Sequence, residues 1–198
     1  MKVTRIETLI QPPQNQIEQH NKIIEEIKAS IAKVVWPLDS DSFKINPTAK
    51  GNGVKPIKNG CMAHLAELGW QLEERLAMTA SMRPGPLDAV KTLENQDKIA
   101  LEWETGNISS SHRAINKIVL GMLFGSLKGG VLILPSRSMY RFLTDRIGNF
   151  QEIEPYFPQW RRPDIDSGFL TIIEIEHDSE DSNSPLIPKG TDGWANFQ

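Results

Sequence analysis

The chain has 198 residues, of which 39% are hydrophobic, so it can bury a substantial core within a single domain over residues 1–198. Its one cysteine excludes an intramolecular disulfide and favours a reducing, cytoplasmic compartment, and the absence of long apolar runs argues against a secretory signal or a membrane partner. The formal net charge of −3, taken alone, argues against a nucleic-acid partner.

The first part of the chain predicts two helices separated by a long loop. Over residues 14–35, isoleucines recur on one helical face, and Pro37 ends the pattern. Residues 39–58 contain Asn, Pro and Gly with little periodicity, and they predict a loop. Residues 60–78 are amphipathic with helical spacing, and Gly69 is the weak point of this second helix.

The middle of the chain predicts two adjacent strands that carry acidic side chains. A Pro-Gly-Pro turn leads into a strand over residues 87–91, and a hairpin-like connection leads to a second strand over residues 98–104. Successive side chains of a strand point to opposite faces, so Glu102 and Glu104 point the same way. Asp88 lies on the neighbouring strand and is the third carboxylate of the group.

The rest of the chain alternates helices with strands. "GNISSSH" opens a helix, with the serines at 109–111 as cap candidates, and the glycines between 125 and 130 end it. "VLILP" predicts a fully buried strand, residues 136–147 another helix, and residues 169–176 the last strand. This order indicates an α/β or α+β layer fold in which helices cover a central sheet.

The paired glutamates have two interpretations. Two acids on one face of a strand are commonly the solvated side of an edge strand. Here the apolar neighbours at 99–101 and Trp103 indicate a strand with little solvent contact. Like charges side by side need a cation or a raised pKa, and Asp88 adds the third carboxylate of a hard-metal site. These observations favour metal binding.

Charged residues are segregated along the chain. Residues 105–144 contain no acid but five basic residues, and residues 43–58 contain no acid but four lysines. The acids concentrate elsewhere, for example in "IEIEHDSEDS" near the C-terminus. This distribution predicts a local electropositive cleft on an acidic protein, although an uneven scatter of charge without function would produce it too.

Several motifs together are far more specific than the acidic pattern. They are "NGVKPIK" at 52–58, "ETGNISS" at 104–110, "LTDR" at 143–146 and "PLIPKG" at 185–190. Across nearly the whole chain the sequence resembles the BamHI-like type II restriction endonucleases of the PD-(D/E)xK superfamily. The resemblance implies an α/β, restriction-endonuclease-like domain with a central mixed β-sheet flanked by helices on both sides.

The resemblance also implies an activity. A bacterial, cytoplasmic homodimer would cleave double-stranded DNA at the palindrome GGATCC, after the first G, leaving 5′-phosphate ends. The helices expected at 112–125 and 136–147 match the interface helices of the family. The family also has a basic C-terminal helix beyond the position of Gln198, and its contacts are not expected here. The competing interpretations are a catalytically inactive DNA-binding protein and a repair nuclease.

The resemblance further assigns roles to residues of the catalytic centre. Asp88, Glu102 and Glu104 stand at the catalytic carboxylate positions. Two Mg²⁺ ions are expected. Their ligands would be Asp88, Glu102, the carbonyl of Trp103, and Glu73, which is expected on the preceding helix. Glu104 stands where most of the superfamily has lysine, and it would orient or deprotonate the attacking water.

DNA contacts are expected at the start of the helix after the second strand and near residue 146. Asn suits adenine and Arg suits guanine in the major groove, and Asp can accept from cytosine. The resemblance places Asn107, Ser109, Arg113, Asp145 and Arg146 at base-reading positions, and Asp192 looks like a contact to the minor groove or flanking DNA. Lys50, Lys55 and Lys58 carry point charges on a predicted loop, so they are expected to contact phosphates. A local ion pair at a helix end is the alternative for Asp145 and Arg146.

Overall fold

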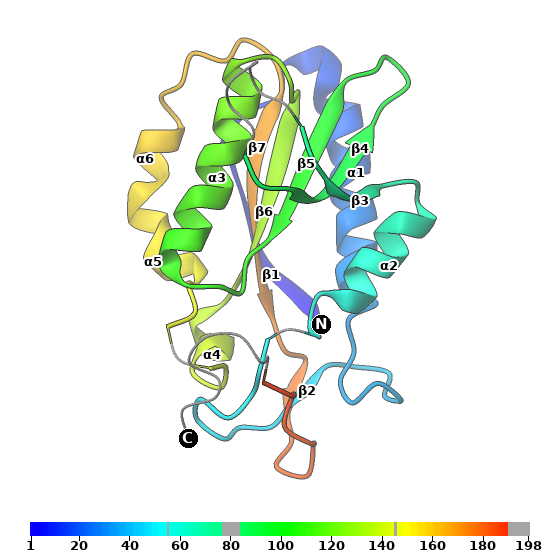
Figure 1. Ribbon diagram of the computed structural model, residues 1–198, viewed down its shortest axis with the longest axis vertical. Coiled ribbons are helices and arrows are strands. Elements are labelled where there is room, and N and C mark those ends of the chain that lie inside the picture. Colours follow the sequence, from blue (N-terminus) through cyan, green and yellow to red (C-terminus); the bar gives the residue numbers. More distant parts are fainter. Residues whose placement is uncertain (55, 77–83, 145, 190–198) are drawn as a thin grey trace.

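A six-stranded mixed sheet forms the centre of the molecule (Figure 1). The computed structural model describes residues 1–54, 56–76, 84–144 and 146–189. The strand order is β1-β7-β6-β5-β4-β3, with parallel pairing of β5, β6 and β7 and antiparallel pairing elsewhere. The strands are β1 (Lys2–Ile10), β3 (Gln71–Glu74), β4 (Leu87–Thr92), β5 (Lys98–Trp103), β6 (Gly129–Pro135) and β7 (Phe169–Glu176).

Helices cover both faces of this sheet (Figure 1). One face packs against α1 (Ile17–Ile31) and α2 (Asn59–Glu67), and the other against α3 (Ile108–Leu123), α5 (Phe150–Ile153) and α6 (Phe157–Trp160). The remaining elements are α4 (Arg137–Tyr140), the 3₁₀ turns η1 (Gln14–Gln16) and η2 (Glu154–Tyr156), and a small parallel pair formed by β2 (Lys44–Ile45) and β8 (Ser179–Glu180). The predicted α/β fold with a mixed sheet between helices is confirmed.

Burial explains the composition of the inner strands. Every residue of β6 is buried, as are all but the last residue of β7, because parallel strands between two helical layers have no solvated face. The apolar side chains divide into one cluster on each face of the sheet. Within the described parts of the chain, no helix is both long and apolar enough to cross a bilayer.

Three expectations about secondary structure were wrong. The helix predicted over 60–78 ends at Glu67, because Gly69 adopts a left-handed φ of 84° and redirects the chain into β3. The helix predicted over 136–147 is only the single turn α4. The predicted loop at 39–58 contributes β2 to the small sheet.

The N-terminal strand β1 was not anticipated. Most of its side chains are exposed or half-buried, so it has little apolar signal, and it forms by pairing with β7 at the edge of the sheet. The predicted serine caps of α3 were also wrong, since Asn107 caps the helix by accepting a hydrogen bond from the Ser110 N–H at 3.0 Å.

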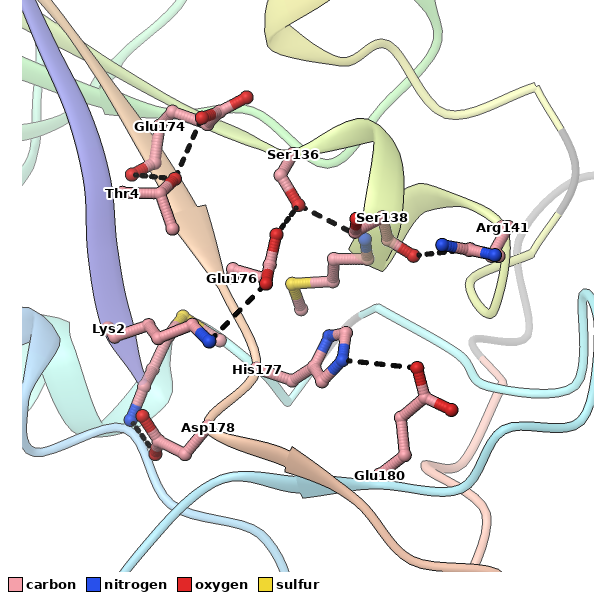
Figure 2. A network of polar contacts seen from close by, with 12 residues as sticks. Lys2, Thr4, Ser136, Ser138, Arg141, Glu174, Glu176, His177, Asp178 and Glu180 are labelled. Atoms are coloured by element: carbon pink, nitrogen blue, oxygen red, sulfur yellow. Dashed lines mark hydrogen bonds and ion pairs between the residues drawn. The ribbon is translucent and has the colours of Figure 1, made fainter.

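A network of polar contacts surrounds the carboxyl end of β7 (Figure 2). Glu176 accepts a hydrogen bond from the Ser136 hydroxyl at 2.8 Å and lies 3.4 Å from the Lys2 ammonium. Asp178 pairs with the amino group of Met1 at 2.7 Å. Each carboxylate therefore has a donor or cation of its own, and the network fastens β7 to β1 and to the start of α4.

Candidate functional site

Asp88 and Glu102 meet across the antiparallel pair of β4 and β5. The register pairs Ala89 with Leu101, which places Asp88 across from Glu102 one step further along. The backbone N–H of Asp88 donates to Glu102 Oε2 at 3.4 Å, and the N–H of Trp103 donates to Asp88 Oδ2 at 2.8 Å. The strand pairing predicted from sequence therefore brings these two carboxylates together.

Glu73 lies in the same row on the next strand. The pairs Leu72–Ala89 and Glu74–Leu87 bracket Glu73 and Asp88, so three acids occupy corresponding positions on β3, β4 and β5. Glu73 is exposed and has a left-handed φ of 53°. Its expected place on a helix was wrong, but the strand register still brings its backbone opposite Asp88.

Glu104 follows directly after β5. Its N–H donates to the carbonyl of Ile133 at 3.0 Å, which extends the pairing with β6 beyond the end of the strand. Its carboxylate lies against Gly106, where an added Cβ would come 3.2 Å from Glu104 Oε2. A side chain at position 106 would therefore require small shifts of Glu104 and Ser110.

Two lysines place their ammonium groups against these carboxylates. Lys58, at the start of α2, lies 2.5 Å from Asp88 Oδ1. Lys117, on α3, pairs with Glu102 Oε1 and also donates to the carbonyl of Pro86 at 2.7 Å. The side chains of Lys117 and Glu102 are only 13% and 5% exposed, so this ion pair is largely removed from water.

The electrostatics of the site disfavour negative charge. Burial first, and then the negative charge of Asp88, raise the pKa of Glu102 to about 7, against the opposing hydrogen bond and charge of Lys117 and the hydrogen bond from the Asp88 N–H. The pKa of Glu104 is also raised, first by burial and then by Asp88, against the opposing Gly106 N–H and the cations of Arg113 and Lys117. Added positive charge would therefore stabilise the ionised site.

The carboxylates do not converge into a finished metal site. Among the described residues, no group of three or more His, Cys, Asp or Glu side chains is close enough to hold a metal ion. Asp88 and Glu102 are instead engaged by ammonium groups. The donor chemistry nonetheless suits a hard cation, since buried carboxylate oxygens already pair with positive charge.

The expected base-reading residues gather near the start of α3. Asn107, Ser109 and Arg113 are exposed there. Asn107 forms an isolated antiparallel bridge with Ile147, and this bridge holds the exposed Arg146 next to the start of the helix.

A second contact joins the same two loops. The Gly148 N–H donates to the Gly106 carbonyl at 2.8 Å. A Cβ at Gly148 would lie 2.7 Å from Ser111 Oγ and 3.2 Å from the Cα of Ile108, so the loop after Arg146 packs closely on α3. The two loops therefore form one surface.

The other expected DNA contacts come from other segments or lie outside the described residues. Lys50 is exposed on the loop before α2, and its backbone N–H donates to the Arg141 carbonyl at 3.0 Å. Lys58 points at Asp88 rather than standing free on a loop. Lys55, Asp145 and Asp192 lie outside the described residues.

Sequence reasoning did not assign Lys117 to the site. The signal was present, because Ala114 and Gly121, three residues before and four residues after Lys117, lie on its face of the helix and are buried. A lysine on such a face needs an acidic partner, but helical periodicity alone does not identify Glu102 as that partner.

Comparison with known proteins places the chain among restriction enzymes. The family model described as restriction endonuclease BamHI matches residues 1–194. The chain is 58% identical over 195 residues to the type II restriction enzyme OkrAI of Oceanobacter kriegii, covering 98% of this chain and 99% of that protein. It is 40% identical over 178 residues to the type II restriction enzyme BamHI of Bacillus amyloliquefaciens, covering 86% and 81%.

A solved structure shares the fold at much lower identity. The restriction endonuclease BglII in complex with a DNA 16-mer superposes with a TM-score of 0.59 at 10% identity, covering 94% of this chain and 90% of that one. At this identity the likeness concerns the arrangement of the sheet and its helices.

Proposed function

The chain belongs to the BamHI family of type II restriction endonucleases, and on this premise we propose that it cleaves double-stranded DNA at GGATCC with Mg²⁺ as cofactor. The observation that carries the proposal is the row of Asp88 and Glu102 on adjacent strands, with Glu104 leading directly into the start of α3. The target sequence rests on the "ETGNISS" and "PLIPKG" motifs. We further propose cleavage after the first G, leaving 5′-phosphate ends, in the cytoplasm of a bacterium.

Asp88 and Glu102 would hold two Mg²⁺ ions, with the Trp103 carbonyl as a further ligand. Bound Mg²⁺ lowers the pKa of a nucleophilic water and stabilises the leaving oxygen of a phosphodiester. Glu104 would orient or deprotonate the attacking water, and its raised pKa suits a general base. Glu73 stays a proposed ligand, because its strand position faces Asp88.

Recognition would divide between base readers and phosphate contacts. We assign Asn107, Ser109, Arg113, Asp145 and Arg146 to bases in the major groove, Lys50 and Lys58 to phosphates, and Asp192 to the minor groove or flanking DNA. A lost base contact costs about 1–3 kcal/mol of discrimination at one base pair. A lost phosphate contact weakens binding to all sequences and reduces its salt dependence.

A binding panel tests this division. Affinities of Arg146→Ala and Lys50→Ala are measured on GGATCC and its single-base variants at two salt concentrations. Arg146→Ala should lose discrimination at one position, and Lys50→Ala should lose affinity evenly. An even loss in Arg146→Ala, or a changed base preference in Lys50→Ala, would refute the assignment.

A homodimer would match the two-fold symmetry of the target. The last turn of α3 and its cap carry two exposed apolar side chains, Leu123 at 51% and Phe124 at 52%, which a second copy could cover. Sedimentation of the double variant Leu123→Asp, Phe124→Asp tests this surface. A wild-type monomer in the presence of target DNA would contradict the dimer.

Plasmid digestion tests the activity itself. With Mg²⁺, the wild type should give discrete fragments that end at GGATCC. Asp88→Ala and Glu102→Ala should bind this site but not cut it, whereas the control Glu94→Ala, an exposed acid in the hairpin between β4 and β5, should cut normally. A smear would indicate a non-specific nuclease, and binding without cleavage by the wild type an inactive DNA-binding protein.

A further inference from the structure

Lys58 and Lys117 hold the same carboxylates that the proposed function gives to metal. Lys58 reaches Asp88 from α2, and Lys117 reaches Glu102 from α3, so the two ammonium groups approach from different elements of the fold. Both are built into their positions, since the side chains of Lys58 and Lys117 are 32% and 13% exposed.

Formal charges show that these lysines and the metal ions compete. Asp88, Glu102 and Glu104, all ionised, together with the two ammonium groups carry a net charge of −1. Two divalent cations would bring the site to +3 with both lysines in place, and to +1 with both displaced. Like charges a few ångströms apart in a partly buried site repel by several kcal/mol, so the full set is unstable without added anions.

We propose that Lys58 and Lys117 are resident counterions, which the metal must displace and which then bind phosphate oxygens of the DNA. The inference rests on the proposed function and adds two positioning residues to it. In the free protein the lysines offset part of the negative charge of the carboxylates and so lower the affinity for metal. Bound DNA supplies phosphates that accept the released ammonium groups, so metal binding and DNA binding favour each other.

Oxygen geometry supports this exchange. Asp88 Oδ1 is the atom held by Lys58, while Oδ2 accepts from the Trp103 N–H and is fixed by the backbone. Glu102 Oε1 is the atom held by Lys117, while Oε2 faces the N–H of Asp88. On both carboxylates, the oxygen without a backbone donor is therefore the one that carries the lysine, and departure of the lysine leaves that oxygen for a cation.

Calorimetric titration with Ca²⁺, in the absence of DNA, tests the proposal. Ca²⁺ binds oxygen ligands, and at pH 8.5 protons compete weakly for the carboxylates. Lys58→Met and Lys117→Met should each bind Ca²⁺ at least about fivefold more tightly than the wild type. The control Lys22→Met, an exposed lysine on α1, should bind like the wild type.

A double variant separates direct competition from a change in folding. If Lys117 acts through Glu102, Lys117→Met should bring no gain in Ca²⁺ affinity in the Glu102→Gln background. Thermal unfolding followed by circular dichroism establishes that each variant is folded. If Lys117→Met does not fold, the Ca²⁺ affinity of Lys58→Met decides the test. Unchanged or weaker Ca²⁺ binding in folded Lys58→Met and Lys117→Met overturns the proposal.

The two proposals fail differently. If the wild type cuts GGATCC but the lysine variants gain no Ca²⁺ affinity, the proposed function stands and the counterion role is refuted. If the lysine variants gain Ca²⁺ affinity but the protein cuts no DNA, the counterion role stands and the proposed function is refuted.

Discussion

The same Glu-x-Glu pattern occurs in two buried strands with opposite outcomes. Glu102 and Glu104 lie at the end of β5, and Glu174 and Glu176 lie at the end of β7 (Figures 1 and 2). Burial does not separate the pairs, since Glu102 is 3% exposed and Glu174 is 6% exposed. The difference lies in the groups around each carboxylate.

The β7 pair has ample neutral donors. Glu174 accepts from Gln151 at 2.6 Å and from the Thr4 hydroxyl at 2.7 Å. Burial would raise the pKa of Glu176, but the Ser136 hydrogen bond and the Lys2 ammonium outweigh it and hold the pKa below its usual value. Glu176 is therefore stable as an anion, and both glutamates act as structural links.

Among the described residues, the neutral donors to the β5 pair are the backbone N–H groups of Asp88 and Gly106, and the pair faces another carboxylate. The pKa values of both glutamates are therefore raised, and their charges depend on cations. The comparison teaches that Glu-x-Glu in a buried strand does not identify a metal site. The β5 pair differs from the β7 pair by a third acid in the same row of the sheet, Asp88, and this acid is what supports the proposed metal site.

Exchanging each acid for its amide should separate the two regions most strongly. Glu102→Gln should reduce cleavage of a GGATCC plasmid by at least about 10³-fold, since a proposed metal ligand is lost. Glu176→Gln should change the cleavage rate by less than about threefold relative to the wild type, because Glu176 lies outside the row of Asp88 and Glu102. Single-turnover rates measure both, and comparable losses in the two variants would remove the distinction.

Changing the sign of charge at Glu104 should also have a large effect. Glu104→Lys introduces the residue that is commoner in the superfamily, but into a site that already contains two lysines. We expect cleavage to fall by about 10²-fold or more, because a third ammonium group would repel the metal. Retained activity with an ordinary Mg²⁺ dependence would show that Glu104 has no specific role.

The two regions should respond to pH with opposite signs. The folded-state pKa of Glu102 is raised to about 7, so the native state binds more protons than the unfolded state from about pH 4.5 to 7, and this group makes stability fall as pH rises. Glu102→Gln should therefore gain up to about 3 kcal/mol relative to the wild type across that window. Urea unfolding in EDTA measures it, and a difference that is constant with pH would contradict the raised pKa.

The smallest expected effect concerns the β7 network. The pKa of Glu176 is lowered, so its contribution is present above the ordinary glutamate pKa near 4.5 and is lost as pH falls below it. Glu176→Gln should cost about 1 kcal/mol at pH 7 and less at pH 3. Urea unfolding at the two pH values provides the test, and an equal cost at both would assign the loss to packing.

Local patterns predicted those elements whose sequences carry a strong periodic signal. The strands expected at 87–91 and 98–104 agree with β4 and β5 to within a residue, and together they placed Asp88 beside Glu102. The strand β1 has little apolar signal because it is a mostly exposed edge strand that depends on β7. Helical spacing could not separate β3 from α2, since the change depends on the backbone turn at Gly69.

The acids of the candidate site could be predicted from the sequence, but the lysines that pair with them could not. A strand pattern determines which acids share a face, and so identified Asp88, Glu102 and Glu104. The pairing of Lys117 with Glu102 depends on how α3 lies across the sheet, a tertiary relation that no local window contains. Glu73 shows the converse, because family resemblance suggested it as a ligand although its secondary structure was mispredicted, and only the strand register places it opposite Asp88.

The hydrogen bond between Gly148 and Gly106 has a consequence for how the specificity of this enzyme could change. Gly106 lies between Glu104 and Asn107 in the chain, and Gly148 lies two residues after Arg146. The proposed reading and cutting groups therefore lie on two loops that this hydrogen bond joins. If Arg146 reads a base as proposed, a substitution that shifts its loop should also shift the loop that carries Glu104, so a new target sequence would require compensating changes there.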